Sequence, residues 1–163
     1  MPALTIEQIP VLGDNFIYLV HDSESGETAA VDPAVAGPVI DALAQHGWTL
    51  SHILNTHHHG DHTGANLELK EVTGCTIVGA GVDAARIPGI DVRIGEGDGI
   101  SIGTHQARVF DVPGHTSGHI AYWFEQDKAL FSGDTLFSMG CGRLFEGTAE
   151  QMWTSLLKLR ALP

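Results

Sequence analysis

The sequence predicts a single-domain α/β protein built as a layered sandwich. Short apolar strands recur in both halves of the chain, and amphipathic helical segments lie between and after them. The 20 glycines supply the tight turns that a fold rich in β-strands needs. A length of 163 residues is enough to bury a substantial core, and we therefore expect one domain over residues 1–163.

The first half of the chain alternates strands with helical segments. Pro38 suits the first turn of a helix and Gly47 its end, with an apolar stripe between them. A second helix is predicted over residues 66–72. The strands that we expect in this half are residues 4–9, 16–20, 27–31, 51–56 and 76–80.

The second half continues the sheet and ends in a helix. Residues 91–111 are alternating and punctuated by glycine, which predicts hairpins, and residues 120–124 and 129–132 predict further strands. Thr148 and Gln151 have the spacing of a capping box, which begins a helix. The residues of this helix expected to face the core are Met152, Trp153, Leu156, Leu157 and Leu159.

The most informative stretch is His57-His58-His59-Gly60-Asp61-His62, directly after the apolar strand 51–56. In an extended segment His57 and His59 point one way and His58 the other. Gly60 then lets the chain turn, so that Asp61 and His62 can form a second cluster beside the first. Imidazole nitrogen and carboxylate oxygen suit zinc, iron or manganese. A histidine-rich surface loop is the alternative, but ligand sites favour the carboxyl ends of strands.

Two later segments carry side chains that could complete a metal site. His115 follows Pro113-Gly114 in a loop; His119 has helical spacing from it, but the intervening glycines argue against a helix. We therefore interpret His115 as a ligand and His119 as a supporting or structural histidine. Asp134 follows an apolar strand and is either a turn residue or a carboxylate that bridges two cations. Two adjacent cations would activate water for hydrolysis.

Composition limits the class of partner and compartment. Acidic residues outnumber basic ones by 20 to 8, and the net charge of −12 argues against nucleic acid or an anionic membrane as partner. Cys75 and Cys141 form no disulfide framework. We expect a cytoplasmic monomer without a membrane span. The histidines interpreted as ordinary surface or core residues are His21, His46, His52 and His105.

Four segments together resemble the metallo-β-lactamase superfamily, and its glyoxalase II (hydroxyacylglutathione hydrolase) branch in particular. They read THHHGDH at 56–62, PGHT at 113–116, GDT at 133–135 and GCGRLFEGT at 140–148. The resemblance runs over essentially the whole chain and implies an αββα four-layer sandwich with mixed β-sheets. It also implies hydrolysis of S-(2-hydroxyacyl)glutathione thioesters, such as S-lactoylglutathione, to glutathione and a 2-hydroxy acid, which is a step of methylglyoxal detoxification.

The resemblance also assigns roles to individual residues. It implies two divalent metal ions, zinc first and iron or manganese as alternatives, with Asp61 and Asp134 as the catalytic carboxylates. Arg143 would meet the glutathione carboxylate, for which a guanidinium is well suited. Cys141, Leu144 and Phe145 would line the same groove, although many relatives have Tyr at position 145. The implied metal ligands are His57, His59 and His115 for the first ion, Asp61 and His62 for the second, and Asp134 as the bridge.

Glyoxalase II normally continues past the position of Pro163 with a seventh ligand and a helical domain. We therefore interpret the chain as a fragment or a shortened form in which the second metal binds more weakly. A mononuclear iron persulfide dioxygenase is an alternative because it shares the Gly-Cys-Gly-Arg segment, although residues 144–148 fit glyoxalase II better. A metal-binding fragment without catalytic activity is the other alternative.

Overall fold

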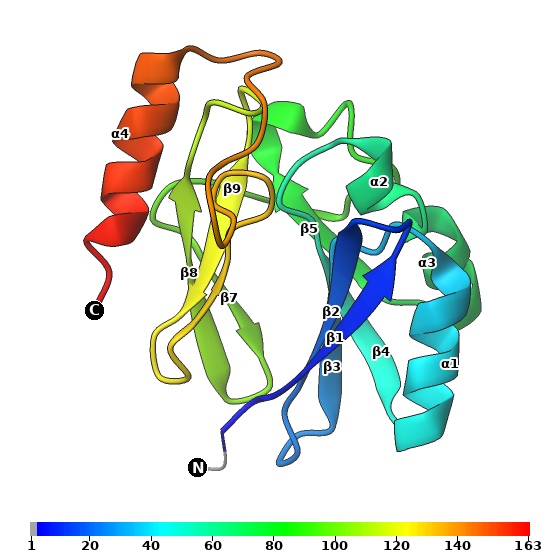
Figure 1. Ribbon diagram of the computed structural model, residues 1–163. Coiled ribbons are helices and arrows are strands. Elements are labelled where there is room, and N and C mark those ends of the chain that lie inside the picture. Colours follow the sequence, from blue (N-terminus) through cyan, green and yellow to red (C-terminus); the bar gives the residue numbers. More distant parts are fainter. Residues whose placement is uncertain (1–2) are drawn as a thin grey trace.

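A computed structural model describes residues 3–163 as two β-sheets packed face to face, with helices on the outer face of each sheet (Figure 1). The first sheet has the order β1-β2-β3-β4-β5-β6 and the second β10-β9-β8-β7. The strands of the first sheet are β1 (Thr5–Val11), β2 (Asn15–His21), β3 (Glu27–Val31), β4 (Thr49–Leu54), β5 (Thr76–Ala80) and β6 (Val92–Ile94). Those of the second are β7 (Gly99–Ile102), β8 (His105–Asp111), β9 (Ile120–Phe124) and β10 (Ala129–Phe131).

Four helices and one 3-10 turn complete the described chain. The helices are α1 (Ala36–His46), α2 (Gly60–Thr63), α3 (Asn66–Thr73) and α4 (Ala149–Arg160), and the turn is η1 (Gly81–Asp83). Gly47 ends α1 in the left-handed conformation with φ 68°, as the sequence predicted. The capping box of Thr148 and Gln151 at the start of α4 is confirmed as well. None of the described helices is long and apolar enough to cross a membrane.

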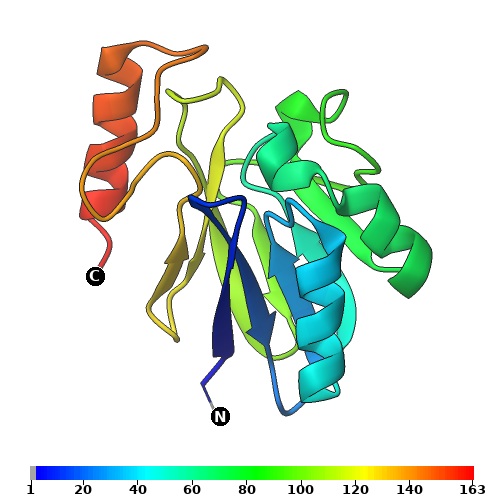
Figure 2. The same cartoon turned by 45° about the vertical axis from the view of Figure 1, so that its right-hand side comes forward.

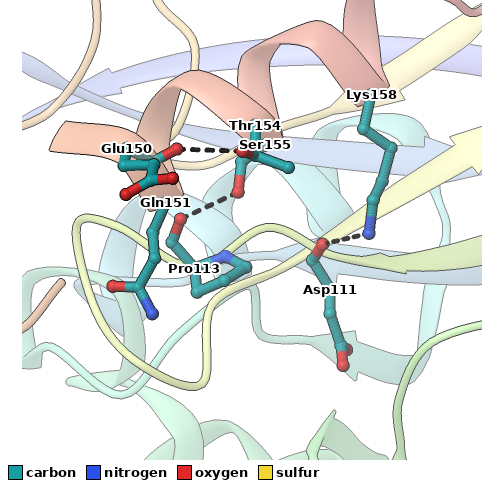
Figure 3. A pocket seen from close by; sticks show the side chains of 7 residues that line it. All are labelled: Asp111, Pro113, Glu150, Gln151, Thr154, Ser155 and Lys158. Carbon is teal, nitrogen blue, oxygen red and sulfur yellow. Dashed lines mark hydrogen bonds between the residues drawn. The ribbon is translucent and has the colours of Figure 1, made fainter. Parts of the chain in front are cut away.

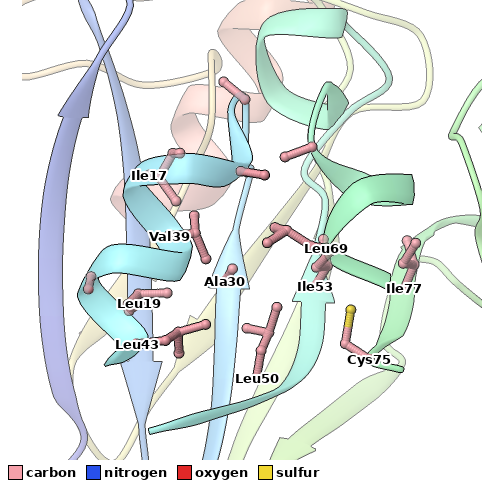
Figure 4. Packing of buried hydrophobic residues seen from close by; sticks show 14 of the residues in the cluster. Ile17, Leu19, Ala30, Val39, Leu43, Leu50, Ile53, Leu69, Cys75 and Ile77 are labelled. Atoms are coloured by element: carbon pink, nitrogen blue, oxygen red, sulfur yellow. The ribbon is translucent and has the colours of Figure 1, made fainter. Parts of the chain in front are cut away.

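Three hydrophobic clusters separate four layers, which confirms the αββα sandwich. The first lies between α1, α3 and the first sheet, and includes Val39, Leu43, Ile53 and Leu69 (Figure 4). The second fills the space between the sheets and the third lies between the second sheet and α4. Neighbouring residues of one strand enter different clusters because side chains alternate across a sheet. The turned view places α1 and α3 on one outer side and α4 on the other (Figure 2).

The first sheet is mixed, as expected. Strands β1, β2 and β3 pair antiparallel, whereas β3, β4, β5 and β6 pair parallel. The second sheet is antiparallel in every described pair. The carboxyl ends of β3 and β4 therefore meet at one edge of the first sheet, next to the loops that follow β8 and β10 (Figure 1). Thr56 joins the sheets there, because its C=O accepts the Ile120 N–H at 2.8 Å.

The prediction of hairpins over residues 91–111 was wrong for its first strand. Only β7 and β8 form a hairpin; β6 pairs parallel with β5 in the other sheet. A turn at residues 95–98 redirects the chain, with the Gly95 N–H bonded to the Asp98 carboxylate at 2.8 Å and the Asp98 N–H to the Gly95 C=O at 3.0 Å. Apolar alternation identifies a strand but does not identify its neighbour.

The predicted core face of α4 was also partly wrong. Met152 and Leu159 are buried, but Trp153 and Leu157 are 61% and 42% exposed. The buried face instead passes through Ser155, whose hydroxyl donates to the Pro113 C=O at 2.8 Å. Residues spaced by three and four positions share a helix face, and the face defined by Met152, Ser155 and Leu159 excludes Trp153 and Leu157.

A cavity of about 390 Å³ lies between α4 and the end of β8. The side chains that line it are drawn in Figure 3. Asp111, Pro113, Glu150, Gln151, Thr154, Ser155 and Lys158 line it. Lys158 Nζ donates to the Asp111 C=O at 2.7 Å and to the Glu96 carboxylate at 2.9 Å. The cavity holds none of the histidines that the sequence singled out, so it lies apart from the candidate site.

The corrected face of α4 leads to a stability prediction for two adjacent residues. Met152→Ala should lower the free energy of unfolding by about 2–5 kcal/mol, because it removes a buried side chain. Trp153→Ala should change it by less than about 1 kcal/mol, because the indole is mostly in solvent. Urea unfolding of both variants measures the difference. A larger loss for Trp153→Ala than for Met152→Ala would contradict the assigned helix face.

Candidate metal centre

The predicted metal ligands converge at the edge of the sandwich where strands of both sheets end. His57 and His59 follow β4, and Asp61 and His62 lie in α2. His115 comes from the loop between β8 and β9, and Asp134 from the loop after β10. The structure therefore brings together residues that are far apart in the sequence.

The first group contains three imidazoles. One donor nitrogen each from His57, His59 and His115 lies within 4.8 Å of the other two. His57 is fully buried and His115 is 3% exposed, whereas His59 is half-buried. His115 Nε2 lies 3.1 Å from His59 Nδ1. Three convergent imidazole nitrogens are a donor set that suits zinc or iron.

The second group lies around His62, next to the first. His62 Nε2 is 3.4 Å from the Asp61 carboxylate and 3.3 Å from Asp134 Oδ1. The other oxygen of Asp134, Oδ2, lies 3.1 Å from His115 Nε2 of the first group. The two oxygens of Asp134 thus face different histidine groups, which is the arrangement that a bridging carboxylate requires.

Asp32, which follows β3, orients ligands of both groups. Its carboxylate accepts the Thr56 N–H at 2.7 Å, the Thr56 hydroxyl at 2.6 Å and His62 Nδ1–H at 3.0 Å. Because the Thr56 hydroxyl donates to Asp32, its oxygen accepts His57 Nδ1–H at 3.0 Å. These contacts leave the Nε2 atoms of His57 and His62 as the nitrogens that can bind a metal.

The surroundings of His57 Nε2 and His62 Nε2 show whether a metal fits this site. Both Nε2 atoms are buried and have no hydrogen-bond partner within residues 3–163. Buried nitrogens without a partner are costly unless a ligand satisfies them. Asp32, His57 and His62 also each place one ligand atom within 4.8 Å of the other two. The Asp32 oxygens already accept three hydrogen bonds, however, and are not free to bind a metal. The donor set therefore fits a divalent metal, with Asp32 as an orienting group.

Two further histidines, His58 and His119, lie beside the cluster. His58 points away from the cluster, toward Asp83 Oδ2 at 3.4 Å and Glu146 Oε1 at 3.6 Å. His119 is 1% exposed and stacks on His57 with ring centroids 4.6 Å apart. Its Nε2 accepts the Asp134 N–H at 3.1 Å. His119 thus supports both a histidine and the carboxylate of the cluster.

Two glycines permit the close approach of the loops. Gly133 has φ 50°, and a Cβ there would lie 2.3 Å from the Thr56 hydroxyl and 2.8 Å from His119 Nε2. At Gly142 a Cβ would lie 2.2 Å from the Asp134 C=O. Neither position can hold a side chain without moving Asp134 or its support.

Electrostatics in the cluster favour neutral imidazoles at His57 and His59 and a charged one at His62. Burial lowers the pKa of His57 and His59. It lowers the pKa of His119 to about 3. Burial also opposes the charge on His62, but the carboxylates of Asp32 and Asp134 outweigh it and raise the pKa of His62 to about 10. Burial raises the pKa of Asp134, yet the neighbouring imidazoles of His115 and His62 hold that pKa well below its usual value. A cation would take the place of the proton on His62.

The segment 141–147, which we call the arm, runs beside the cluster. Its Arg143 C=O accepts His115 Nδ1–H at 2.7 Å, and the Gly142 N–H donates to the Asp134 C=O at 2.9 Å. The Phe145 ring lies edge-on to His59 and His115, with centroids 5.5 and 5.2 Å apart. Cys141, Arg143, Leu144 and Phe145 are exposed, so their side chains remain accessible at the rim of the site.

Comparison with known proteins agrees with this geometry. The family model of the metallo-beta-lactamase superfamily matches residues 11–163. The chain belongs to this superfamily. It is 68% identical over 160 residues to a curated hydroxyacylglutathione hydrolase from Methylococcus capsulatus, covering 98% of this chain and 62% of that relative. The chain thus spans less than two thirds of the length of this relative.

Two solved structures have the same fold. The crystal structure of ETHE1 from Myxococcus xanthus superposes with a TM-score of 0.87 at 30% identity, covering 98% of this chain and 71% of that one. A di-iron-bound form of TTHA1623 has a TM-score of 0.78 at 27% identity, covering 98% and 87%. Both matches extend over nearly the whole chain and so agree with the four-layer architecture.

Sequence reasoning did not find the orienting role of Asp32 and Thr56. One signal was present: Asp32 directly follows an apolar strand, as His57 and Asp134 nearly do. Because β3 and β4 are parallel neighbours, their carboxyl ends lie at the same edge. The position of Asp32 was therefore predictable once the two strands were paired, but its contacts were not.

The orienting role of Asp32 can be tested by Asp32→Asn. The amide would turn a donor toward Thr56 and His62, so buried donors lose their acceptor and the free energy of unfolding should fall by about 1–3 kcal/mol. Zinc binding, measured by isothermal titration calorimetry, should weaken about 10- to 100-fold. Asp41→Asn, at an exposed position of α1, is the control. Unchanged zinc affinity in Asp32→Asn would contradict the role.

Proposed function

We propose that this chain is the metal-binding catalytic domain of a hydroxyacylglutathione hydrolase, cleaving S-(2-hydroxyacyl)glutathione thioesters such as S-lactoylglutathione. The observation that carries the proposal is Asp134, whose oxygens lie 3.1 and 3.3 Å from histidines of two different groups. The 68% identity to a relative named hydroxyacylglutathione hydrolase supports the substrate class. The two adjacent groups support a hydrolytic reaction.

The residues present would hold two divalent ions. His57, His59, His115 and Asp134 would bind the first, and Asp61, His62 and Asp134 the second. Zinc fits this donor set, and iron or manganese fits it too; TTHA1623, a relative at 27% identity, was crystallised in a di-iron-bound form. Asp61 has a side chain that is 53% exposed, so we expect the second ion to bind more loosely.

The chain's own residues orient the reaction. When bound, the metal pair would lower the pKa of water toward neutrality and stabilise negative charge on the thioester carbonyl oxygen. Asp134 would hold the two ligand groups at a fixed separation, because His119 fixes its backbone. Asp32 and Thr56 keep Nδ1 of His57 and His62 occupied, so Nε2 of each ring is left for the metal.

Arg143 is the proposed anchor for the substrate. Its guanidinium is exposed at the rim and makes no hydrogen bond or ion pair with any residue that the structure describes, so it is available to a carboxylate. The planar fork of Arg matches a carboxylate, and glutathione carries two. Phe145 next to His59 and His115 would give the substrate an apolar wall.

The metal count separates this proposal from the persulfide dioxygenase alternative, which needs one iron. The placement of Asp134 between two histidine groups favours a pair of ions. A thioester assay separates it from a domain that binds metal without catalysis. We expect release of free thiol from S-lactoylglutathione only with metal-loaded protein.

Asp134→Asn tests the bridging role. A neutral amide is a much poorer bridging ligand than a carboxylate, so thioester hydrolysis should fall about 100-fold or more and metal content should drop. Elemental analysis and the thiol-release assay measure the two effects. Asn also suits turns, so the variant should be nearly silent if Asp134 is only a turn residue. Asp41→Asn serves again as the control with the same chemical change.

Arg143→Met tests the anchor. Losing a charge-assisted contact to the substrate should raise KM roughly tenfold and leave kcat nearly unchanged. Arg160→Met, at the exposed end of α4, should change neither constant. A fall in kcat with constant KM would instead place Arg143 in the chemical step.

A further inference from the structure

A network of charged side chains lies on the side of His58 that faces away from the metal cluster. Arg86 is at its centre and contacts two carboxylates. Its Nη2 and Nε lie 2.7 and 3.2 Å from Asp83 Oδ1, and its Nη1 and Nη2 lie 2.5 and 3.1 Å from the two oxygens of Glu146. Exposed ion pairs usually contribute little to stability. Bidentate pairing of a guanidinium with carboxylates within a network is the exception.

Glu146 connects this network to the loop that carries His115. Its Oε2 accepts the Ser117 N–H at 2.7 Å and the Ser117 hydroxyl at 2.8 Å. Ser117 is two residues after His115. One carboxylate therefore receives hydrogen bonds from both Arg86 and the His115 loop.

The same network encloses His58, which lies between two predicted ligands. The His58 ring is 15% exposed and lies between Asp83 Oδ2 and Glu146 Oε1, 3.4 and 3.6 Å from its two nitrogens. Because His57 and His59 flank His58 in the chain, a fixed His58 ring restricts the backbone of both. The network thus restrains the segment that carries His57 and His59 by way of His58.

Glu146 is also part of the arm. On one side of it the Phe145 N–H donates to the His115 C=O at 3.3 Å, and on the other the Gly147 N–H donates to the Gly114 C=O at 2.9 Å. The arm in turn holds the His115 ring through the Arg143 C=O. Glu146 is therefore where the arm, the His115 loop and the His58 segment meet.

We propose that Glu146 is a positioning residue that, through Arg86, Ser117 and His58, preorganises the first metal site and fixes the arm beside it. The inference rests on the proposed metal-dependent function and adds to it. It assigns a role in metal affinity to a side chain that contacts no predicted metal ligand through its carboxylate. A metal that binds to preassembled imidazoles does not have to order the loops that carry them.

The test compares Glu146→Gln with Arg86→Met and with the control Glu71→Gln, at an exposed position of α3. Each variant of the 163-residue chain is stripped of metal and titrated with zinc by calorimetry. Cobalt absorption spectra of the same proteins report the geometry of the first site. Thermal unfolding of the metal-free proteins shows separately whether the fold has changed.

Glu146→Gln and Arg86→Met should each weaken zinc affinity at the tighter site about tenfold. This is the low end of the loss in metal affinity that follows removal of a group supporting the metal ligands. Both should alter the cobalt spectrum, and Glu71→Gln should match the unmodified chain. Zinc affinity and cobalt spectra unchanged in both variants would overturn the inference, as would a loss of thermal stability alone. A chain that binds no metal in unmodified form would instead overturn the proposed function.

Discussion

The candidate metal centre depends on the hydrogen bonds that the Asp32 carboxylate accepts. Asp32 leaves β3 with φ 50° and reaches across to the neighbouring parallel strand, where it accepts from Thr56 and His62. One buried carboxylate thus sets the ring orientation of His62 directly and that of His57 through the Thr56 hydroxyl. A carboxylate buried to this degree is costly without donors, so the site and the strand ends that supply the donors stabilise one another.

The two-sheet architecture explains why the predicted ligands come from three segments of the chain. The first sheet supplies His57, His59, Asp61 and His62 after β4, and the second supplies His115 after β8 and Asp134 after β10. The Thr56 C=O accepts the Ile120 N–H, so the strand ends of the two sheets are hydrogen-bonded at this edge. The position of Asp134 depends on both sheets, because its backbone is held by His119 while its oxygens face His62 and His115.

The sequence carried enough information for most of the fold and for the membership of the cluster. Strong local signals were reliable: β5 and β9 have the predicted bounds, Gly47 ends α1, and the capping box begins α4. The failures involve tertiary choices. Nothing local decides that β6 joins β5, or that α4 buries Ser155 in place of Trp153. Asp32 escaped notice for the same reason, since its role exists only once β3 and β4 lie side by side.

His62 of the second group and His115 of the first are held by different segments of the chain. His62 is oriented from the first sheet by Asp32, whereas His115 is oriented by the Arg143 C=O in the arm. The arm also carries the side chains at the rim of the site, and its Gly142 N–H donates to the Asp134 C=O, so a movement of the arm would shift both His115 and the proposed bridging carboxylate. Coupling between two sites is reciprocal in free energy. If the arm holds the substrate, metal occupancy and substrate affinity are therefore linked through His115 and Asp134, and Asp134 extends that linkage to the second group.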